Sequence, residues 1–156
     1  MESIDDGPPT ALRRSPTWLM GQAGIHAQRL LNERMAEVGA HRWHYSVLSA
    51  LAENGPLSQA SLGRLCRLDR SDIAAVVGEL EGGGYLVREP DPVDRRRNVV
   101  TITPEGSRHQ RRLEALAVEA QEDLLAPLGA GERETLIALV GRLVEHQSGR
   151  RGAGWA

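Results

Sequence analysis

The sequence has no lysine and no phenylalanine, five aromatic residues and one cysteine. The lone Cys66 excludes a disulfide within the chain. The first residues, MESIDDGPP, carry acids where a secretory signal needs a basic and then an apolar run. No apolar run approaches about 18 residues, the length needed to cross a membrane. These absences predict a cytoplasmic protein with no membrane partner.

The charge of the chain is nearly balanced, with 19 basic and 21 acidic residues and a net charge of −2. This balance excludes a simple polycation that coats nucleic acid. The charge is unevenly placed, however, because ten arginines and eight acids lie between Arg64 and Arg112. We therefore expect the middle of this 156-residue chain, which has the length of one domain, to face anions.

Polar and apolar residues alternate along the two arms of residues 85–106. On the first arm, Leu86 is expected to point inward and Arg88 outward. On the second arm, Val100 and Ile102 are expected to point inward. A period of two is typical of half-buried strands, so the pattern predicts a β-hairpin.

The tip of this hairpin carries three consecutive arginines, Arg95, Arg96 and Arg97. A lone hairpin is marginal in water, and these side chains have no apolar surface to cover. Guanidinium groups suit phosphates and the minor groove, where the potential is strongly negative. The tip is thus either a solvated turn or a contact to nucleic acid.

The residues before the hairpin predict a helix-turn-helix. Ser58 is expected to cap a short helix, and Asp69 a second helix with an apolar stripe at i, i+3, i+4 and i+7 from Ile73. Asp72 stands three residues after this cap, in the position of a capping box. A hairpin directly after these helices makes the unit a winged helix-turn-helix, which favours the nucleic-acid contact.

The flanking segments predict longer helices. Residues 1–16 are expected to form an irregular arm, Thr17 to cap a helix over 17–38, and a further helix to span 42–53. Helical segments over about 105–147 precede a disordered tail, 148–156. The apolar faces of the end helices exceed what the small winged unit can cover, which predicts a homodimer. The expected fold is mainly α, with a two-stranded β-wing.

The segment 57–106 resembles the MarR family of transcriptional regulators. It carries an L-x-x-x-G-hydrophobic exit from the second helix, a D-x-R wing and a following hydrophobic-T-x-x-G. The resemblance implies one MarR-like domain over 17–147, with a DNA-binding lobe at about 42–104 and dimerisation helices at about 17–38 and 105–147. It also implies a homodimer that binds a pseudo-palindromic operator, usually as a repressor. Such a dimer usually releases the DNA when it meets a small anionic or aromatic ligand or an oxidant.

The resemblance further assigns DNA-binding roles to particular residues. Arg96 is expected to enter the minor groove, oriented by Asp94. Ala74 and Ala75 depart from the usual threonine and basic residue, and an alanine can contact only a thymine methyl. Asp72 is either a capping residue or a base contact. The predicted DNA-binding residues are Ser58, Gln59, Arg70, Ser71, Asp72, Ala74, Ala75, Asp94, Arg95, Arg96 and Arg97.

Aromatic and imidazole side chains gather at the start of the first long helix and along the second. In the family that the chain resembles, the effector cleft lies between these helices and the DNA-binding lobe. Flat rings beside imidazoles and arginines suit a small aromatic or phenolic acid, although core packing is the alternative explanation. The predicted ligand residues are Arg13, Arg14, Trp18, His26, Trp43 and His44.

Other chemistries find less support. Neighbouring arginines would favour a thiolate at Cys66 and a redox-responsive regulator, but its apolar neighbours indicate a buried thiol. His41 and His44 have the i, i+3 spacing of a metal pair without a visible third ligand, so no metal or cofactor is expected. No nucleophile elbow or phosphate loop is present, which argues against an enzyme. A winged helix that binds another protein remains an alternative.

Overall fold

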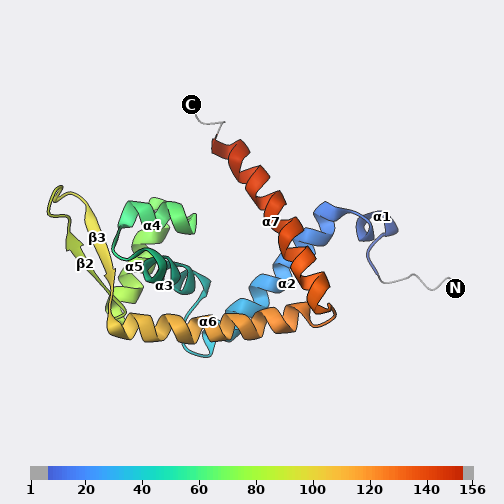
Figure 1. Cartoon of the computed structure of the whole chain (residues 1–156), viewed down its shortest axis with the longest axis horizontal. Helices are drawn as coiled ribbons and strands as arrows, with labels where there is room; N and C mark the ends of the chain where they lie inside the picture. The colour runs from blue at the N-terminus through green and yellow to red at the C-terminus, as the bar shows by residue number, and fades with distance from the viewer. Residues whose placement is uncertain (1–6, 153–156) are drawn as a thin grey trace. The chain divides into compact units, whose positions relative to one another are not determined.

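The computed structural model describes residues 7–152, which form seven helices and three strands (Figure 1). The chain divides into two compact units, Met1–Gln121 and Glu122–Ala156. The elements in chain order are α1 Thr10–Arg13, α2 Pro16–Ala36, α3 Arg42–Asn54, β1 Leu57–Ser58, α4 Gln59–Cys66, α5 Arg70–Gly82, β2 Leu86–Pro90, β3 Asn98–Ile102, α6 Pro104–Leu125 and α7 Ala130–Gly152.

The core of the first unit lies where α3, α4 and α5 gather beside the sheet (Figure 1). Apolar side chains from each element are removed from water there, which is the main favourable contribution to folding. Met35 of α2 and Leu113 of α6 are also fully buried in this core, so both flanking helices are anchored to the winged unit. The largest fully buried side chains are Met35, Leu48, Leu51, Leu62, Leu80, Leu86, Leu113, Val47, Val77 and Val100.

The N-terminal segment differs from the expectation in two ways. Residues 10–13 form the short helix α1 within the predicted irregular arm, whose residues 1–6 lie outside the described part. The cap of α2 is Ser15 and not Thr17, because Ser15 Oγ accepts the N–H of Trp18 at 3.4 Å. Pro16 then occupies the first helical position, where its missing N–H costs nothing.

The predicted helix-turn-helix is present with both of its caps. Ser58 Oγ accepts the N–H of Ser61 at 3.1 Å, and Asp69 Oδ1 accepts the N–H of Asp72 at 2.8 Å. Between the helices, Arg67 adopts a left-handed conformation with φ 55°, which ends α4 and turns the chain toward α5.

We expect Ser58→Ala to lower the free energy of unfolding by about 1 kcal/mol, the usual cost of losing a serine cap. Urea denaturation of the purified variant measures the change. Ser58→Thr keeps the capping oxygen and serves as the control. If the alanine and threonine variants unfold at the same urea concentration, the cap contributes nothing to stability.

The predicted two-stranded β-wing is formed by β2 and β3, and the short strand β1 extends it to an antiparallel sheet in the order β1-β3-β2. Leu57 and Ser58 of β1 pair with Val100 and Val99 of β3. A strand of two residues has no periodicity, so the sequence pattern carries no sign of it. Because β1 runs directly into α4, its pairing with β3 connects the sheet to the start of that helix.

The register of the hairpin corrects the expectation for Arg88. It pairs with Val100 and, two residues after Leu86, shares the inward face. Its side chain is half-buried, and Nη2 contacts Glu81 Oε1 of α5 at 2.9 Å. An arginine is tolerated at this inward position because its charge has a carboxylate partner.

The T-x-x-G sequence at the exit of the wing has a structural reason. Thr103 Oγ1 accepts the N–H of Gly106 at 3.0 Å, while the Thr103 N–H donates to the Tyr85 carbonyl at 3.1 Å. A Cβ on Gly106 would lie 1.8 Å from that same carbonyl oxygen. Only glycine therefore lets α6 start this close to the base of the wing.

The second unit consists of the end of α6 and the helix α7. Arg133 closes the turn by donating to the carbonyls of Leu125 and Leu128 and by pairing with Glu122 at 2.7 Å. The helix continues through residues 148–152, which were predicted to be disordered, and residues 153–156 lie outside the described part.

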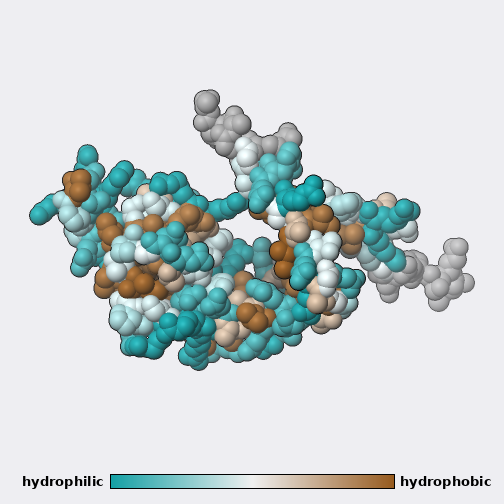
Figure 2. Space-filling model, viewed as in Figure 1, coloured by the Kyte–Doolittle hydropathy of each residue, from teal (hydrophilic) through white to brown (hydrophobic). Residues whose placement is uncertain are grey.

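Among the residues of α7 whose burial is described, none is fully buried. Brown, apolar surface is visible where α7 lies in Figure 2. The large apolar side chains exposed along this helix are Leu136, Ile137, Leu139, Leu143 and Val144.

Candidate nucleic-acid interface

A groove of about 810 Å³ lies between α4, the start of α5 and the wing. Arginine side chains dominate its charged lining, with Asp69 as the single acid. The arginines in this lining are Arg64, Arg67, Arg70, Arg96 and Arg97. A concave surface lined by one sign of charge concentrates the field, so the groove attracts anions.

Asp69, the acid of this lining, has a structural role as the cap of α5. Its carboxylate accepts the N–H of Asp72 and the hydroxyl of Ser71, both as part of the helix cap. The hydrogen bond from Asp72 and the one from Ser71 lower the pKa of Asp69, so the carboxylate stays ionised while it caps α5. Its charge is directed at the N-terminus of the helix.

The tip of the wing is built to hold Arg96 outward. Asp94 Oδ1 accepts both the backbone N–H and Nε of Arg96 at 3.1 Å. This side-chain hydrogen bond lowers the pKa of Asp94. The Arg96 side chain is 91% exposed, so the guanidinium is oriented without being covered. The pair expected from the D-x-R motif is formed.

The structure brings five of the predicted DNA-binding residues together. Ser58, Gln59, Arg70, Arg96 and Arg97 all line the groove. Ser71, Asp72 and Ala75 are exposed on α5, Ala74 is half-buried, and Arg95 is exposed on the wing.

Two arginines of the groove are absent from the sequence-based set. Arg64 and Arg67 stand at the end of α4, three residues apart, and were considered only as neighbours of Cys66. Arg64 Nη2 donates to Ser61 Oγ at 2.9 Å, which holds it along α4. Their place at the end of the first helix of the helix-turn-helix, close to Arg70 in the sequence, is the signal that would have identified them.

The predicted ligand residues are distributed over α1, α2 and α3. Trp18 and Trp43 are half-buried, His26 is exposed on α2, and Arg42 lies 4.5 Å above the Trp43 ring. His44 lines a separate pocket of about 470 Å³ together with residues of α5 and α6. A common site for these six residues therefore stays a prediction.

Cys66 is only 8% exposed and packs in the core. Burial raises the pKa of its thiol, which keeps it protonated. A reactive cysteine needs the opposite, an accessible thiol with a lowered pKa. The structure therefore favours the packing role and not the redox-responsive alternative.

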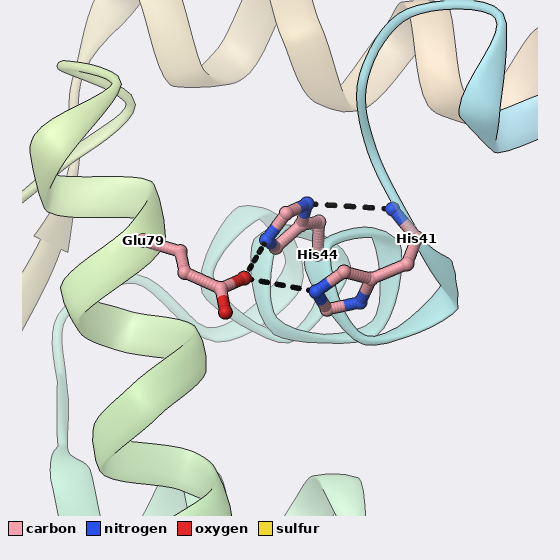
Figure 3. Close-up of polar contacts among 3 residues, drawn as sticks. All are labelled: His41, His44 and Glu79. Carbon is pink, nitrogen blue, oxygen red and sulfur yellow. Dashed lines mark hydrogen bonds and ion pairs between the residues drawn. The ribbon is translucent and has the colours of Figure 1, made fainter.

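His41 and His44 do have a third potential ligand, which corrects the sequence analysis. Their Nε2 atoms lie 2.9 and 2.6 Å from the same oxygen, Oε2 of Glu79 (Figure 3). Burial lowers the pKa of His44 and outweighs its bond to Glu79, while the hydrogen bonds from His41 and His44 lower the pKa of Glu79. A neutral imidazole and an ionised carboxylate thus meet between α3 and α5.

Within residues 7–152, no helix is long and apolar enough to cross a lipid bilayer.

Comparison with known proteins agrees with this geometry. A sequence model of the MarR family matches residues 39–97, from the turn before α3 to the wing. A putative transcriptional regulatory protein for the hcr operon of Thauera aromatica is 39% identical over 104 residues, 67% of this chain and 63% of that protein. The match covers 62 to 64% of the length of three curated relatives.

Solved structures extend the likeness over most of the chain. A probable transcriptional regulator from Pseudomonas aeruginosa has a TM-score of 0.77 and 34% identity over 85% of this chain and 98% of that one. The PcaV transcriptional regulator from Streptomyces coelicolor, in complex with its natural ligand, has a TM-score of 0.75 and 32% identity over 93% of this chain and 98% of its own. The chain therefore belongs to the MarR family of winged helix-turn-helix transcriptional regulators.

Proposed function

We propose that the protein is a ligand-responsive repressor that binds a pseudo-palindromic operator as a homodimer. The observation that carries this proposal is the groove in which five arginines of α4, α5 and the wing surround the start of the second helix of the helix-turn-helix. Arginines in this arrangement neutralise the phosphates on either side of a helix that enters the major groove.

The side chains of α5 suggest how the operator is read. Arg70 and Ser71 stand in its first turn and can donate hydrogen bonds to base edges, whereas Ala75 offers only a methyl contact. Arg96 would enter the adjacent minor groove, where width and potential depend on sequence. Sequence specificity would then come from a few base contacts and, to a larger extent, from the shape of the DNA duplex.

The exposed apolar residues of α2 and α7 support the homodimer. Leu19, Met20 and Ile25 are exposed on α2, as are the five apolar residues of α7. Apolar surface of this extent on two long helices marks an interface, and a second copy of the chain is the simplest partner. A dimer would place two recognition helices on half-sites about one helical turn apart.

Binding to DNA fragments from the region around the protein's own gene tests the proposal. We expect one protected site with two half-sites in a footprint, and an affinity that falls steeply as salt rises, because phosphate contacts release counterions. A winged helix that docks onto proteins would show neither. Weak binding that is the same for every fragment would contradict operator recognition.

We further expect a small aromatic acid, such as a phenolic carboxylate, to bind near Trp18 and Trp43 and to lower operator affinity. A coupling of about 1 to 3 kcal/mol, or 5- to 150-fold, is typical of allosteric release. The likeness to PcaV, solved with its natural ligand, supports a small-molecule effector. The measurement is quenching of tryptophan fluorescence in a Trp155→Phe background, which leaves Trp18 and Trp43 as the reporters.

The control for this experiment is an aliphatic acid of similar size, which carries the charge but not the ring. If millimolar aromatic acids neither quench the fluorescence nor shift the operator binding curve, Trp18 and Trp43 serve core packing. If an aromatic acid does bind, Arg13→Ala and His26→Ala test whether these two side chains contact it, and unchanged ligand affinity in both variants would remove them from the site.

A further inference from the structure

Three side chains that can bind metal converge from distant parts of the sequence. His41 precedes α3, His44 lies in its first turn, and Glu79 comes from α5, the recognition helix of the proposed repressor. One ligand atom from each residue lies within 4.8 Å of the other two. Figure 3 shows both imidazole rings directed at the Glu79 carboxylate.

The spacing of these atoms is close to that of a metal site. Zinc binds imidazole nitrogens and carboxylate oxygens at about 2.0 to 2.2 Å, so neighbouring ligands in a tetrahedron are about 3.3 Å apart. The Nε2 atoms of His41 and His44 lie 2.9 and 2.6 Å from Glu79 Oε2. These separations would have to grow by about 0.4 and 0.7 Å to reach the spacing of zinc ligands.

Packing alone explains the cluster poorly. The two imidazole rings stack with centroids 3.7 Å apart while both contact one carboxylate oxygen. The other ring nitrogen of His41, Nδ1, is buried and has no hydrogen-bond partner within the described residues. Both imidazoles thus present Nε2 to one carboxylate, which places three potential ligand groups around a common point.

We propose that His41, His44 and Glu79 form a binding site for a divalent transition-metal ion, with zinc as the expected ion. Two imidazoles and one carboxylate form a ligand set that zinc accepts, and water would take the fourth position. Each ring would bind through Nε2 and carry its proton on Nδ1. The long 3.4 Å contact from the His41 N–H to His44 Nδ1 would be lost.

The surroundings leave the site open to solvent and to exchange. The three residues line the pocket of about 470 Å³ that Tyr85 and His109 also border. The Glu79 side chain is 52% exposed, which allows an ion to enter without unfolding. The stacked rings of Tyr85 and His109 lie at this pocket, 4.1 Å apart.

The position of Glu79 gives the ion a regulatory consequence, which rests on the proposed function. The helix that carries Glu79 also carries Arg70 of the arginine groove. A bound ion would join this helix to α3 and so restrict its position. If the restricted position differs in its affinity for DNA, metal and DNA affect each other's binding equally.

Metal binding is measured on the full chain without a polyhistidine tag, after removal of metal with EDTA. We expect calorimetry to show one Zn²⁺ per chain at micromolar concentration, and Co²⁺ to give the intense visible absorption of four-coordinate cobalt. Glu79→Gln and His44→Gln should each weaken binding by at least about 100-fold. Glu79→Asp retains a carboxylate and should bind more tightly than Glu79→Gln.

The matched controls are His26→Gln and Glu89→Gln, which remove an exposed imidazole and an exposed carboxylate elsewhere. Both should bind zinc like the parent, and circular dichroism confirms the fold of every variant. If the parent binds no zinc at micromolar concentration, or if Glu79→Gln binds it equally well, the three residues form only a hydrogen-bonded contact and the proposal is wrong.

The coupling between metal and DNA is tested separately, by measuring operator affinity with and without Zn²⁺. We expect at least a fivefold change for the parent and none for Glu79→Gln. Zinc binding without a change in operator affinity would keep the metal site and reject its coupling to DNA. A parent that binds zinc but no operator would contradict the proposed function and leave the metal site intact.

Discussion

Removing residues 130–156 should make the protein monomeric and lower its affinity for a duplex with two half-sites by at least about 100-fold. The buried apolar residues of the described structure end at Ala120, so the deletion leaves the core of the winged unit complete. It removes the exposed apolar residues of α7 that we assign to the dimer. Two linked half-site contacts typically exceed a single one by 10² to 10⁴ in affinity.

Sedimentation and duplex titration measure both effects, and point variants distinguish the interface from the loss of a whole helix. Leu139→Glu combined with Leu143→Glu places charges in the apolar surface and should reproduce the monomer. The matched control, Glu134→Ala with Arg142→Ala, changes exposed charged positions on the same helix. A truncated protein that still sediments as a dimer and binds the full site would show that α7 is not the interface.

Arg96→Ala should weaken operator binding by about 1 to 3 kcal/mol, or roughly 5- to 150-fold, without destabilising the fold. The guanidinium is 91% exposed and held outward by Asp94, so it contributes nothing to the core. In the minor groove it would meet the strong negative potential that favours arginine. Fluorescence anisotropy at fixed salt measures the affinity, and urea unfolding measures the fold.

Two comparisons make the Arg96 experiment specific. Arg29→Ala removes another exposed arginine, paired with Glu33 on α2, and should leave operator affinity unchanged. Arg95→Ala and Arg97→Ala should each act as the loss of a phosphate contact, reducing the salt slope by about 1 with a smaller effect on affinity. Equal operator affinity for Arg96→Ala and the parent would exclude the wing tip from recognition.

The helix-turn-helix and its caps were predictable from the sequence because their signals are local. Ser58 and Asp69 each bond an N–H three residues ahead, and the stripe from Ile73 repeats within one helix. The pairing of Asp94 with Arg96 was implied by the resemblance of the wing to the D-x-R motif, and the structure forms it between residues two apart. The N-cap of α2 was predicted wrongly as Thr17, although the signal for Ser15 is also local. Pro16 favours the first helical position, which makes the residue before it the cap.

The sequence by itself determined the winged helix-turn-helix and its arginine tip, through periodicity, caps and neighbouring charges. Only the tertiary structure decided which distant side chains meet: β1 with β3, Arg88 with Glu81, and Arg64 with the wing groove. Glu79 reaches His41 and His44 across 38 and 35 residues. Such contacts depend on how α3 and α5 pack around the shared core, and neither helix encodes that packing in its own pattern.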